Sequence, residues 1–260
     1  KEVRPFEISH WLQRCQSWKL KYPVVLPEYK ECKDAVNSFY FVQTLSEKLG
    51  EKAVIITDMG TSFTCTMQTF KTKLGQRLST SSGHASMGFG LPGAIGACIG
   101  NNRKDTICIS GDGGLQMNIQ ELQTIVHYNL PIKLFVLNNN GYLTIKATQQ
   151  NHFGRFVGAE KSSGVTCPDI IKIAKAYGLP NTRIANTEEL NLKLDSVLQA
   201  TGPIVCEIIM EENQPLIPRV SSLKKPDGTI ISKPIEDLYP FLSREEFREN
   251  MIVDPAEILK

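Results

Sequence analysis

Four short apolar runs, with helical patterns between them, constrain the fold of this chain most strongly. The runs are rich in Val, Ile or Leu and cover residues 53–57, 106–110, 132–137 and 203–209. Continuous apolar runs of this length are typical of parallel strands that are buried on both faces. Strands that alternate with helices predict an α/β fold, a doubly wound and mainly parallel sheet with helices on both faces.

Three helices are predicted around these strands. The first ends before Pro131 and carries an apolar stripe at steps of four, three and four residues: Leu115, Ile119, Leu122 and Val126. The second, with Pro168 in its first turn and Gly178 at its end, repeats the pattern: Ile170, Ile171, Ala174 and Tyr177. A third helix covers residues 35–49 and is closed by Gly50.

The two flanks of the α/β segment have a different character. Residues 1–34 predict a lead-in helix, with Trp11, Cys15 and Trp18 on one side, followed by a proline-punctuated linker. Residues 35–210 form the predicted ligand-binding domain. Residues 211–260 hold six of the fourteen prolines and predict an extended C-terminal arm that ends in a short helix.

Charge and composition exclude two classes of partner. With 29 basic and 27 acidic residues the net charge is +2, and no dense Lys/Arg cluster is present, so we expect no nucleic-acid binding. Residues 78–102 carry no charge and are long enough to cross a bilayer, but six glycines and many polar residues exclude a membrane span. The seven cysteines form no C-x-x-C pair, which predicts free thiols and a cytoplasmic location.

Three small polar loops follow the first three apolar runs, at residues 57–62, 111–114 and 138–142. Ligands of open α/β sheets bind at the carboxyl ends of the strands, where these loops meet. Glycines in the second loop let a ligand approach the backbone N–H groups, and the helix that begins near Gln116 directs its positive end there. Asp112 and Asn139 offer oxygen ligands, which suit Mg²⁺ or Ca²⁺ better than zinc. A site for a cation and phosphates is therefore predicted.

Each of these loops on its own is also typical of an ordinary turn. Their spacing is more informative, since the 24 residues between Gly113 and Asn138 suffice for one helix and one strand. This arrangement resembles the diphosphate-binding motif of thiamine-diphosphate-dependent enzymes, GDG followed after about two dozen residues by NN. Residues 82–97, SGHASMGFGLPGAIGA, and residues 120–125, QELQTI, resemble the acetolactate synthase group, and the similarity covers most of residues 35–210.

This resemblance implies the carboxy-terminal, diphosphate-binding domain of such an enzyme, with thiamine diphosphate and Mg²⁺ as cofactors. It implies that Mg²⁺ is held by Asp112, Asn139 and the carbonyl of Gly141. The residues that it places against the diphosphate are Thr61, Ser62, Gly111, Gly113, Gly114 and the N–H of Tyr142. It further implies that Met87 separates the two rings of the cofactor and that the Ala85 carbonyl accepts a hydrogen bond from the aminopyrimidine.

Two features of the same segment have simpler interpretations. Residues 88–93 satisfy G-x-G-x-x-G, but no hydrophobic strand precedes them, so the context of a dinucleotide site is missing. We expect these glycines to allow close helix packing instead. Without the family resemblance, Met87 would be interpreted as a core residue.

The chain also departs from the acetolactate synthases. Thr61-Ser62 stands where those enzymes have Gln-His, and Thr148 stands where they have the tryptophan that selects the second keto acid. At the positions near that tryptophan, this chain has Thr144 and Ile145. We therefore expect a different acceptor, for which a keto-sugar is one candidate.

The implied activity is decarboxylation of a 2-oxo acid such as pyruvate and transfer of the two-carbon unit to a carbonyl acceptor, in a homo-oligomer. In the family, a Glu from a separate pyrimidine-binding domain activates the cofactor, and no such domain is found in these 260 residues. Glu121 is interpreted as a surface or helix-supporting charge, so the activating Glu is expected on another domain or chain and the chain alone is expected to be inactive. Two alternatives remain: a split-subunit 2-oxoacid decarboxylase and a non-catalytic flavodoxin-like binding domain.

Overall fold

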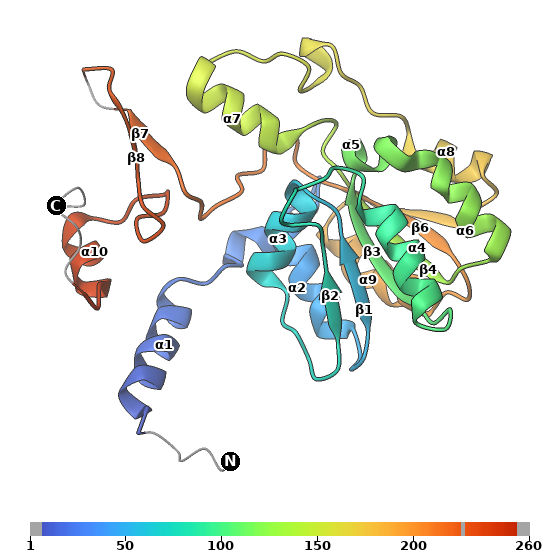
Figure 1. The fold of residues 1–260 in the computed structure, drawn as a ribbon, viewed down its shortest axis with the longest axis horizontal. Helices are drawn as coiled ribbons and strands as arrows, with labels where there is room; N and C mark the ends of the chain where they lie inside the picture. Colours follow the sequence, from blue (N-terminus) through green and yellow to red (C-terminus); the bar gives the residue numbers. More distant parts are fainter. Residues whose placement is uncertain (1–6, 225–226, 254–260) are drawn as a thin grey trace. The chain divides into compact units, whose positions relative to one another are not determined.

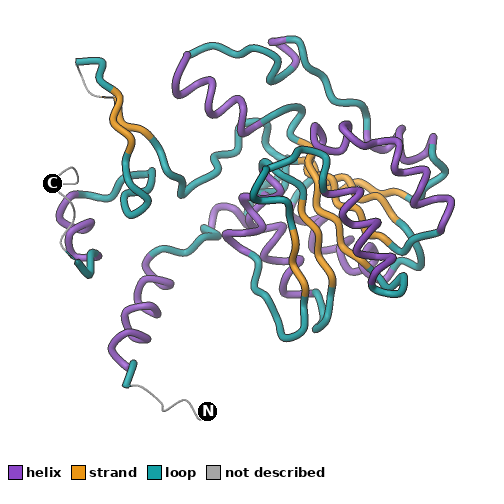
Figure 2. The backbone as a smooth tube through the Cα atoms, in the orientation of Figure 1, coloured by secondary structure: helices purple, strands orange, loops and turns teal. Residues whose placement is uncertain are grey.

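The computed structural model describes residues 7–224 and 227–253 of the chain (Figures 1 and 2). Two compact units are present, one ending at Gln214 and the other beginning at Pro215. The first unit contains a six-stranded sheet, and the second contains a small two-stranded sheet. Residues 1–6 of the predicted lead-in and residues 254–260 of the predicted arm lie outside the described residues. The predicted segment boundaries at residues 34 and 210 remain predictions.

The large sheet has the strand order β2-β1-β3-β4-β6-β5, and every pair of neighbours is parallel. Its strands are β1 (Val54–Thr57), β2 (Arg77–Ser79), β3 (Thr106–Gly111), β4 (Ile132–Asn138), β5 (Asn181–Ile184) and β6 (Ile204–Ile209). The four predicted apolar runs became β1, β3, β4 and β6, and the doubly wound α/β fold is confirmed. The short strands β2 and β5 at the two edges were not predicted.

Helices cover both faces of this sheet (Figure 1). On one face α4 (Gly90–Gly100), α6 (Leu122–Tyr128) and α8 (Ile170–Ala176) pack against alternate strand residues such as Ile132, Leu134 and Val136. The other face carries α2 (Ser38–Lys48) and α9 (Thr187–Gln199), and there the Phe41 and Phe135 ring centroids lie 5.3 Å apart. Because successive side chains of a strand point to opposite faces, a continuous apolar run presents apolar side chains to the helices on both faces of the sheet.

The predicted helix with the 115–126 stripe is interrupted. It divides into α5 (Asp112–Leu115), the 3₁₀ helix η2 (Gln116–Glu121) and α6, with non-helical dihedral angles at Asn118. The Asn118 side chain donates to the backbone carbonyl of Gly88 at 2.8 Å, a contact between segments that local periodicity does not reveal. The prediction of one continuous helix beginning near Gln116 was therefore wrong, although Leu115 and Leu122 are buried as expected.

The remaining helices agree better with the sequence. In α2 the side chain of Asn37 caps the first turn by accepting from the N–H groups of Phe39 and Tyr40. The N-cap of α8 is Asp169, so Pro168 precedes the helix and does not lie in its first turn as predicted. In α1 (Ser9–Lys21) the rings of Trp11 and Trp18 meet edge to face at 5.8 Å, which confirms that they share one side. The predicted linker holds the 3₁₀ helix η1 (Pro27–Lys30).

The second unit contains a hairpin that was not predicted, formed by β7 (Ser222–Lys224) and β8 (Ile230–Ser232). A short helix, α10 (Arg244–Asn250), follows it, as expected for the end of the arm. Arg244 forms a two-pronged ion pair with Asp237, with both N–O distances at 2.9 Å. Among the residues that the structure describes, no helix has both the length and the apolar composition needed to cross a bilayer.

Candidate functional site

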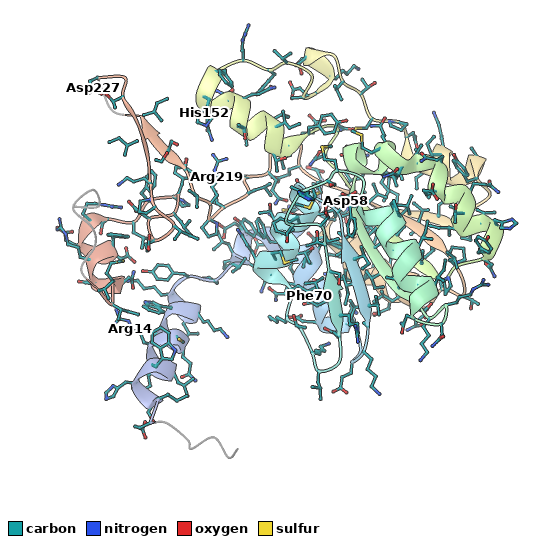
Figure 3. All side chains as sticks on the ribbon, viewed as in Figure 1. Arg14, Asp58, Phe70, His152, Arg219 and Asp227 are labelled. Atoms are coloured by element: carbon teal, nitrogen blue, oxygen red, sulfur yellow. The ribbon has the colours of Figure 1, made fainter. Side chains whose placement is uncertain are left out.

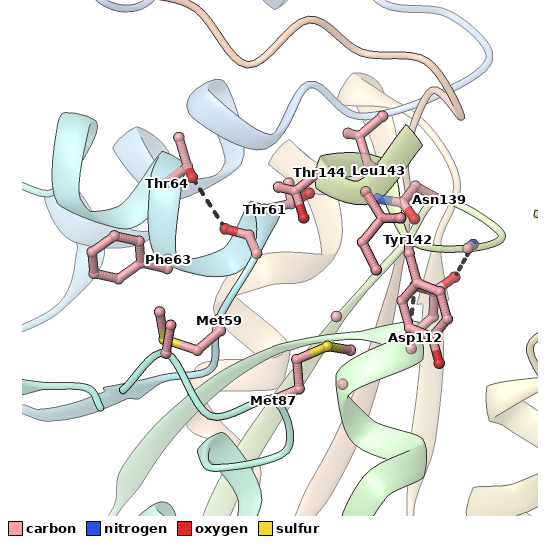
Figure 4. Close-up of a pocket in the computed structure, with 17 residues that line it drawn as sticks. Met59, Thr61, Phe63, Thr64, Met87, Asp112, Asn139, Tyr142, Leu143 and Thr144 are labelled. Atoms are coloured by element: carbon pink, nitrogen blue, oxygen red, sulfur yellow. Dashed lines mark hydrogen bonds between the residues drawn. The ribbon is translucent and has the colours of Figure 1, made fainter. Parts of the chain in front are cut away.

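The carboxyl ends of β1, β3 and β4 border one pocket, and the three predicted loops line it together. Residues 59–61 follow β1, residues 111–114 end β3 and begin α5, and Asn139 and residues 141–145 follow β4. Two residues of the segment between β2 and α4, Ala85 and Met87, also line it, and Figure 4 shows the Met87 side chain. Strand order explains this grouping, because β1, β3 and β4 are consecutive neighbours in the sheet.

Asp112 is the buried carboxylate of the pocket, with a relative exposure of 1%. It accepts hydrogen bonds from the N–H of Gly113 at 2.8 Å and from the N–H of Gly141 at 3.1 Å. The thiol of Cys167 is a further hydrogen-bond partner. Burial nevertheless dominates and raises the pKa of Asp112 from 3.8 to about 6. A nearby cation would favour the ionised form of this carboxyl group.

Asn139 lies in the loop after β4 and is 5% exposed. Its side-chain oxygen Oδ1 is buried and has no hydrogen-bond partner within the described part of the chain. Its neighbours in the loop are held firmly, since the Asn138 side chain accepts from the N–H of Asn140 at 3.0 Å and donates to Glu207 at 2.7 Å. A buried acceptor left without a donor is costly, and a role as a ligand to an ion is one recognised explanation.

Gly113 and Tyr142 touch across the pocket wall. A Cβ atom on Gly113 would lie 2.3 Å from Cε1 of the Tyr142 ring, so only glycine fits beside this ring. The N–H of Tyr142 donates to the carbonyl of Ala159 at 2.9 Å. This N–H is therefore already used and does not agree with the predicted role as a donor to a diphosphate, whereas the Tyr142 side chain does line the pocket.

The first turn of α3 (Thr61–Thr69) forms the wall opposite Asp112 (Figure 4). Gly60, with φ of +74°, and Thr61 line the pocket, and N–H groups in the first turn of a helix lack partners within the helix. Such a terminus suits an anion. Ser62 behaves differently from the prediction: it is fully buried, donates to the carbonyl of Met59 at 2.9 Å and is not a lining residue.

Met87 enters the pocket between Met59 and the loop that carries Asp112 (Figure 4). Its side chain is 40% exposed, so it is not a core residue. Ala85, on the same wall, has a positive φ of 54°.

The glycines of the G-x-G-x-x-G pattern allow close packing, as expected, since a Cβ atom on Gly93 would lie 3.2 Å from Ile56.

The far wall belongs to α7 (Leu143–Phe153). Thr144 and Ile145 line the pocket, whereas Thr148 does not, and its hydroxyl donates to the carbonyl of Thr144 at 3.0 Å. Leu143, Met59, Phe63 and Thr64 also line the pocket and were not singled out from the sequence. For Phe63 and Thr64 a signal existed, because they lie within one turn of the predicted residue Thr61 on α3.

Cys167 is the other residue near Asp112 that sequence reasoning missed. Burial, followed by the charge of Asp112, raises the pKa of its thiol to about 12. The thiol therefore stays protonated at neutral pH and serves as a hydrogen-bond donor to the carboxylate. No sequence signal marks this cysteine, because 55 residues separate it from Asp112 and only the fold brings them together.

The oxygen atoms that could bind a metal in this pocket suit a hard cation. One carboxylate and one amide oxygen are ligand types that Mg²⁺ accepts together with phosphates and water. The described residues contain no cluster of three or more His, Cys, Asp or Glu side chains that could hold a metal by themselves. A cation at Asp112 and Asn139 would consequently depend on a ligand that brings oxygens of its own.

A family model describes most of this unit. Residues 58–208 match the model of the thiamine pyrophosphate enzyme, C-terminal TPP binding domain, where TPP is thiamine diphosphate. The matched segment begins directly after β1 and ends in β6, so it contains the pocket-lining residues of all three loops.

Curated relatives show the same similarity. The chain is 33% identical over 214 residues to an acetolactate synthase large subunit of Cyanidium caldarium, covering 81% of the chain and 35% of the relative. For the large subunit of Pyropia yezoensis the identity is 33% over 232 residues, covering 88% and 38%. For the chloroplastic acetolactate synthase 2 of Nicotiana tabacum it is 31% over 222 residues, covering 83% and 33%. The chain thus spans about a third of the length of these relatives.

Proposed function

The chain belongs to the thiamine-diphosphate-dependent enzymes of the acetolactate synthase group, and it matches their C-terminal cofactor-binding domain. From this premise we propose that it forms one half of a carboligase active site, the half that binds Mg²⁺ and the diphosphate of the cofactor. The activity proposed is decarboxylation of a 2-oxo acid such as pyruvate and transfer of the two-carbon unit to a carbonyl acceptor. The observation that carries the cation site is the buried side-chain oxygen of Asn139, which has no hydrogen-bond partner among the described residues. It lies in the loop whose Gly141 N–H donates to Asp112.

Three groups would hold Mg²⁺: the Asp112 carboxylate, the Asn139 oxygen and the Gly141 carbonyl. The diphosphate would lie against the glycine loop at residues 111–114 and against the first turn of α3 at Thr61. The terminus of α3 supports this proposal, since N–H groups in the first turn of a helix have no partner within the helix and suit an anion. Glycine at 113 and 114 supports it in another way, because the missing side chains let an anion approach the backbone closely. Met87 and Ala85 would face the ring portion of the cofactor from the wall opposite the loop.

Thiamine diphosphate, when bound, supplies the electron sink for decarboxylation, and the protein supplies position and electrostatics. Asp112 would enter this site ionised, since Mg²⁺ offsets the burial that raises its pKa. Thr144 and Ile145 would contact the acceptor, because they line the pocket on the side of α7. With Thr148 in place of the family's tryptophan, we favour an acceptor other than the keto acids of the acetolactate synthases, and a keto-sugar remains the candidate.

We further propose that the 260-residue chain alone does not catalyse the reaction. The family match concerns a C-terminal cofactor-binding domain, and the chain covers about a third of its relatives. A pyrimidine-binding domain or subunit would provide the activating Glu, and a homo-oligomer would bring the two together. Decarboxylation of pyruvate by the isolated chain at the rate of a complete enzyme would contradict this proposal.

Calorimetry tests the cofactor site directly. Titration of the chain with thiamine diphosphate in Mg²⁺ should release heat, and Asp112→Ala should abolish that heat. A matched control is Asp195→Ala on α9, because this carboxylate pairs with Lys48 at 2.7 Å outside the pocket. Equal heats for wild type and Asp112→Ala would refute the proposed site.

The two alternatives make different predictions. A split-subunit 2-oxoacid decarboxylase would give no acetolactate-type product when the missing partner is restored. A non-catalytic flavodoxin-like domain would show no Mg²⁺ requirement and no binding of thiamine diphosphate. A cytoplasmic location is also only proposed, and the named relatives from Nicotiana tabacum are chloroplastic.

A further inference from the structure

Asp58 is a second buried carboxylate beside the pocket, and the proposed cofactor contacts do not use it. It directly follows β1 and is fully buried (Figure 3). All its side-chain partners among the described residues are hydrogen-bond donors: Met59 N–H at 2.8 Å, Gly88 N–H at 3.0 Å, Ser110 Oγ at 2.8 Å and the N–H of Gly90. Burial raises the pKa of Asp58, which shows that these donors only partly replace water.

These bonds connect three segments that meet at the pocket. Asp58 belongs to the loop after β1, and Ser110 belongs to the end of β3 next to the glycine loop. Gly88 belongs to the turn that leads into α4, and Gly90 is the first residue of that helix. The backbone N–H of Asp58 also donates to the carbonyl of Ile109 at 2.8 Å, which fixes Asp58 itself to β3. The carboxylate therefore sets the position of the turn relative to the glycine loop.

Two glycines leave room for this carboxylate. A Cβ atom on Gly90 would lie 2.8 Å from the Cβ of Asp58, and one on Gly114 would lie 2.8 Å from its Oδ2. Real Cβ atoms essentially never approach other atoms so closely, so both segments pack against Asp58 with no space to spare. Gly114 lines the pocket, and the turn carries Met87.

Asp58 holds the peptide group that joins Met87 to Gly88, because the N–H of this peptide, which belongs to Gly88, donates to the Asp58 carboxylate. The carbonyl of Gly88 is held by the Asn118 side chain at 2.8 Å. Met87 itself is 40% exposed and gains little from packing in the core. Its place in the pocket therefore depends on these two backbone tethers.

We propose that Asp58 is a positioning residue that holds Met87, and the wall on which it lies, at the distance from the glycine loop that the ring portion of thiamine diphosphate requires. This inference rests on the proposed function and extends it. Loss of Asp58 should weaken contacts to the rings while leaving the contacts to Mg²⁺ and the diphosphate in place.

The test compares two probes on the same 260-residue chain, Mg²⁺ with thiamine diphosphate and Mg²⁺ with inorganic pyrophosphate, by calorimetry. For Asp58→Ala we expect affinity for thiamine diphosphate to fall about tenfold or more, as for loss of a hydrogen bond to a charged group, with affinity for pyrophosphate little changed. Asp58→Asn should restore most of the loss, because its amide oxygen can accept from Gly88 while its NH₂ donates to Ser110. The Ser110 hydroxyl could then turn to the carbonyl of Gly111, which lies 3.3 Å away.

Asn37→Ala is the matched control, since Asn37 is also buried and accepts from two backbone N–H groups, but lies at the start of α2 outside the pocket. It should lower stability without separating the two affinities. If Asp58→Ala does not fold, Asn118→Ala removes the other tether of the same turn and should separate the affinities in the same way.

Equal losses for both probes in the Asp58 or Asn118 variants, or an unchanged affinity for thiamine diphosphate, would overturn the positioning role. Failure of the wild-type chain to bind either probe would instead refute the proposed function itself. The two failures are therefore distinguishable.

Discussion

The backbone N–H of Gly141 donates to Oδ2 of Asp112 at 3.1 Å, although 29 residues separate the two. This bond joins the loop after β3 to the loop after β4, and it brings the proposed cation ligands together before any cation is bound. Arrangement of ligands in advance lowers the cost of binding. Substitutions in and around these loops should therefore change the stability of the ligand-free chain, its affinity for Mg²⁺ with a diphosphate, or both.

Gly113→Ala should destabilise the chain, whereas Gly111→Ala should not. The added Cβ at 113 would lie 2.3 Å from the Tyr142 ring, but the one at 111 would meet no atom within 4 Å. We expect Gly113→Ala to cost about 1–3 kcal/mol, as for overpacking, and Gly111→Ala to stay within about 0.5 kcal/mol of wild type. Urea unfolding of both variants measures the difference, and equal stabilities would contradict the observed packing.

Asn139→Ala should separate stability from binding. Because Oδ1 of Asn139 is buried without a partner among the described residues, its removal should leave the stability of the ligand-free chain unchanged or raise it. Affinity for Mg²⁺ with pyrophosphate should fall about tenfold or more, since a cation ligand is lost. Thermal melting and calorimetry provide the two measurements. A clear loss of stability together with unchanged affinity would show that Asn139 is only structural.

The ionisation of Asp112 should make stability depend on pH. Its pKa rises from an ordinary value of 3.8 to about 6 in the fold, so the folded chain holds this proton more tightly than the unfolded chain. The resulting penalty is absent below pH 3.8, grows as the pH rises towards 6 and reaches about 3 kcal/mol above it.

The advantage of Asp112→Asn over wild type should therefore be larger at pH 7 than at pH 5, by about 1 kcal/mol. Comparison of the variant with wild type cancels the contributions of other groups, including Asp58. Urea unfolding at both pH values without Mg²⁺ measures it. An advantage that is the same at pH 5 and pH 7 would contradict the raised pKa.

Asn37→Ala should cost about 1 kcal/mol by removing the N-cap of α2. The Asn37 side chain accepts from Phe39 N–H at 3.0 Å and from Tyr40 N–H at 3.4 Å, and Asn37 is only 4% exposed. Asn37→Asp should retain most of the stability, since aspartate caps equally well. Thermal unfolding distinguishes the two variants, and an Ala variant as stable as wild type would show that the cap contributes nothing.

The sequence predicted the strands that are buried on both faces, and missed those that are not. β3 and β4 carry continuous apolar runs because both faces meet helices. β2 consists of Arg77, Leu78 and Ser79, with exposed, intermediate and exposed positions, and no apolar pattern marks it. The edge of a sheet has one neighbouring strand, so its residues need not be apolar.

The candidate site was predicted as far as it depends on chain order. Loops that follow neighbouring parallel strands must meet, so the residues around Thr61, Asp112 and Asn139 could be grouped without a structure. The role of Asp58 could not be predicted, since its donors Gly88 and Ser110 lie 30 and 52 positions away. The break at Asn118 was missed for the same reason, because a hydrogen bond to a distant carbonyl overrides the helical period.

The short edge strands of the large sheet also affect how the protein behaves in concentrated solution. Its edge strands, β2 and β5, have three and four residues, whereas β3, β4 and β6 have six, seven and six. Exposed edges of sheets are where other chains add strands and aggregation begins, and short edges that carry charges such as Arg77 and Arg183 resist this. The concentrated solutions that calorimetry requires should therefore remain free of edge-to-edge association.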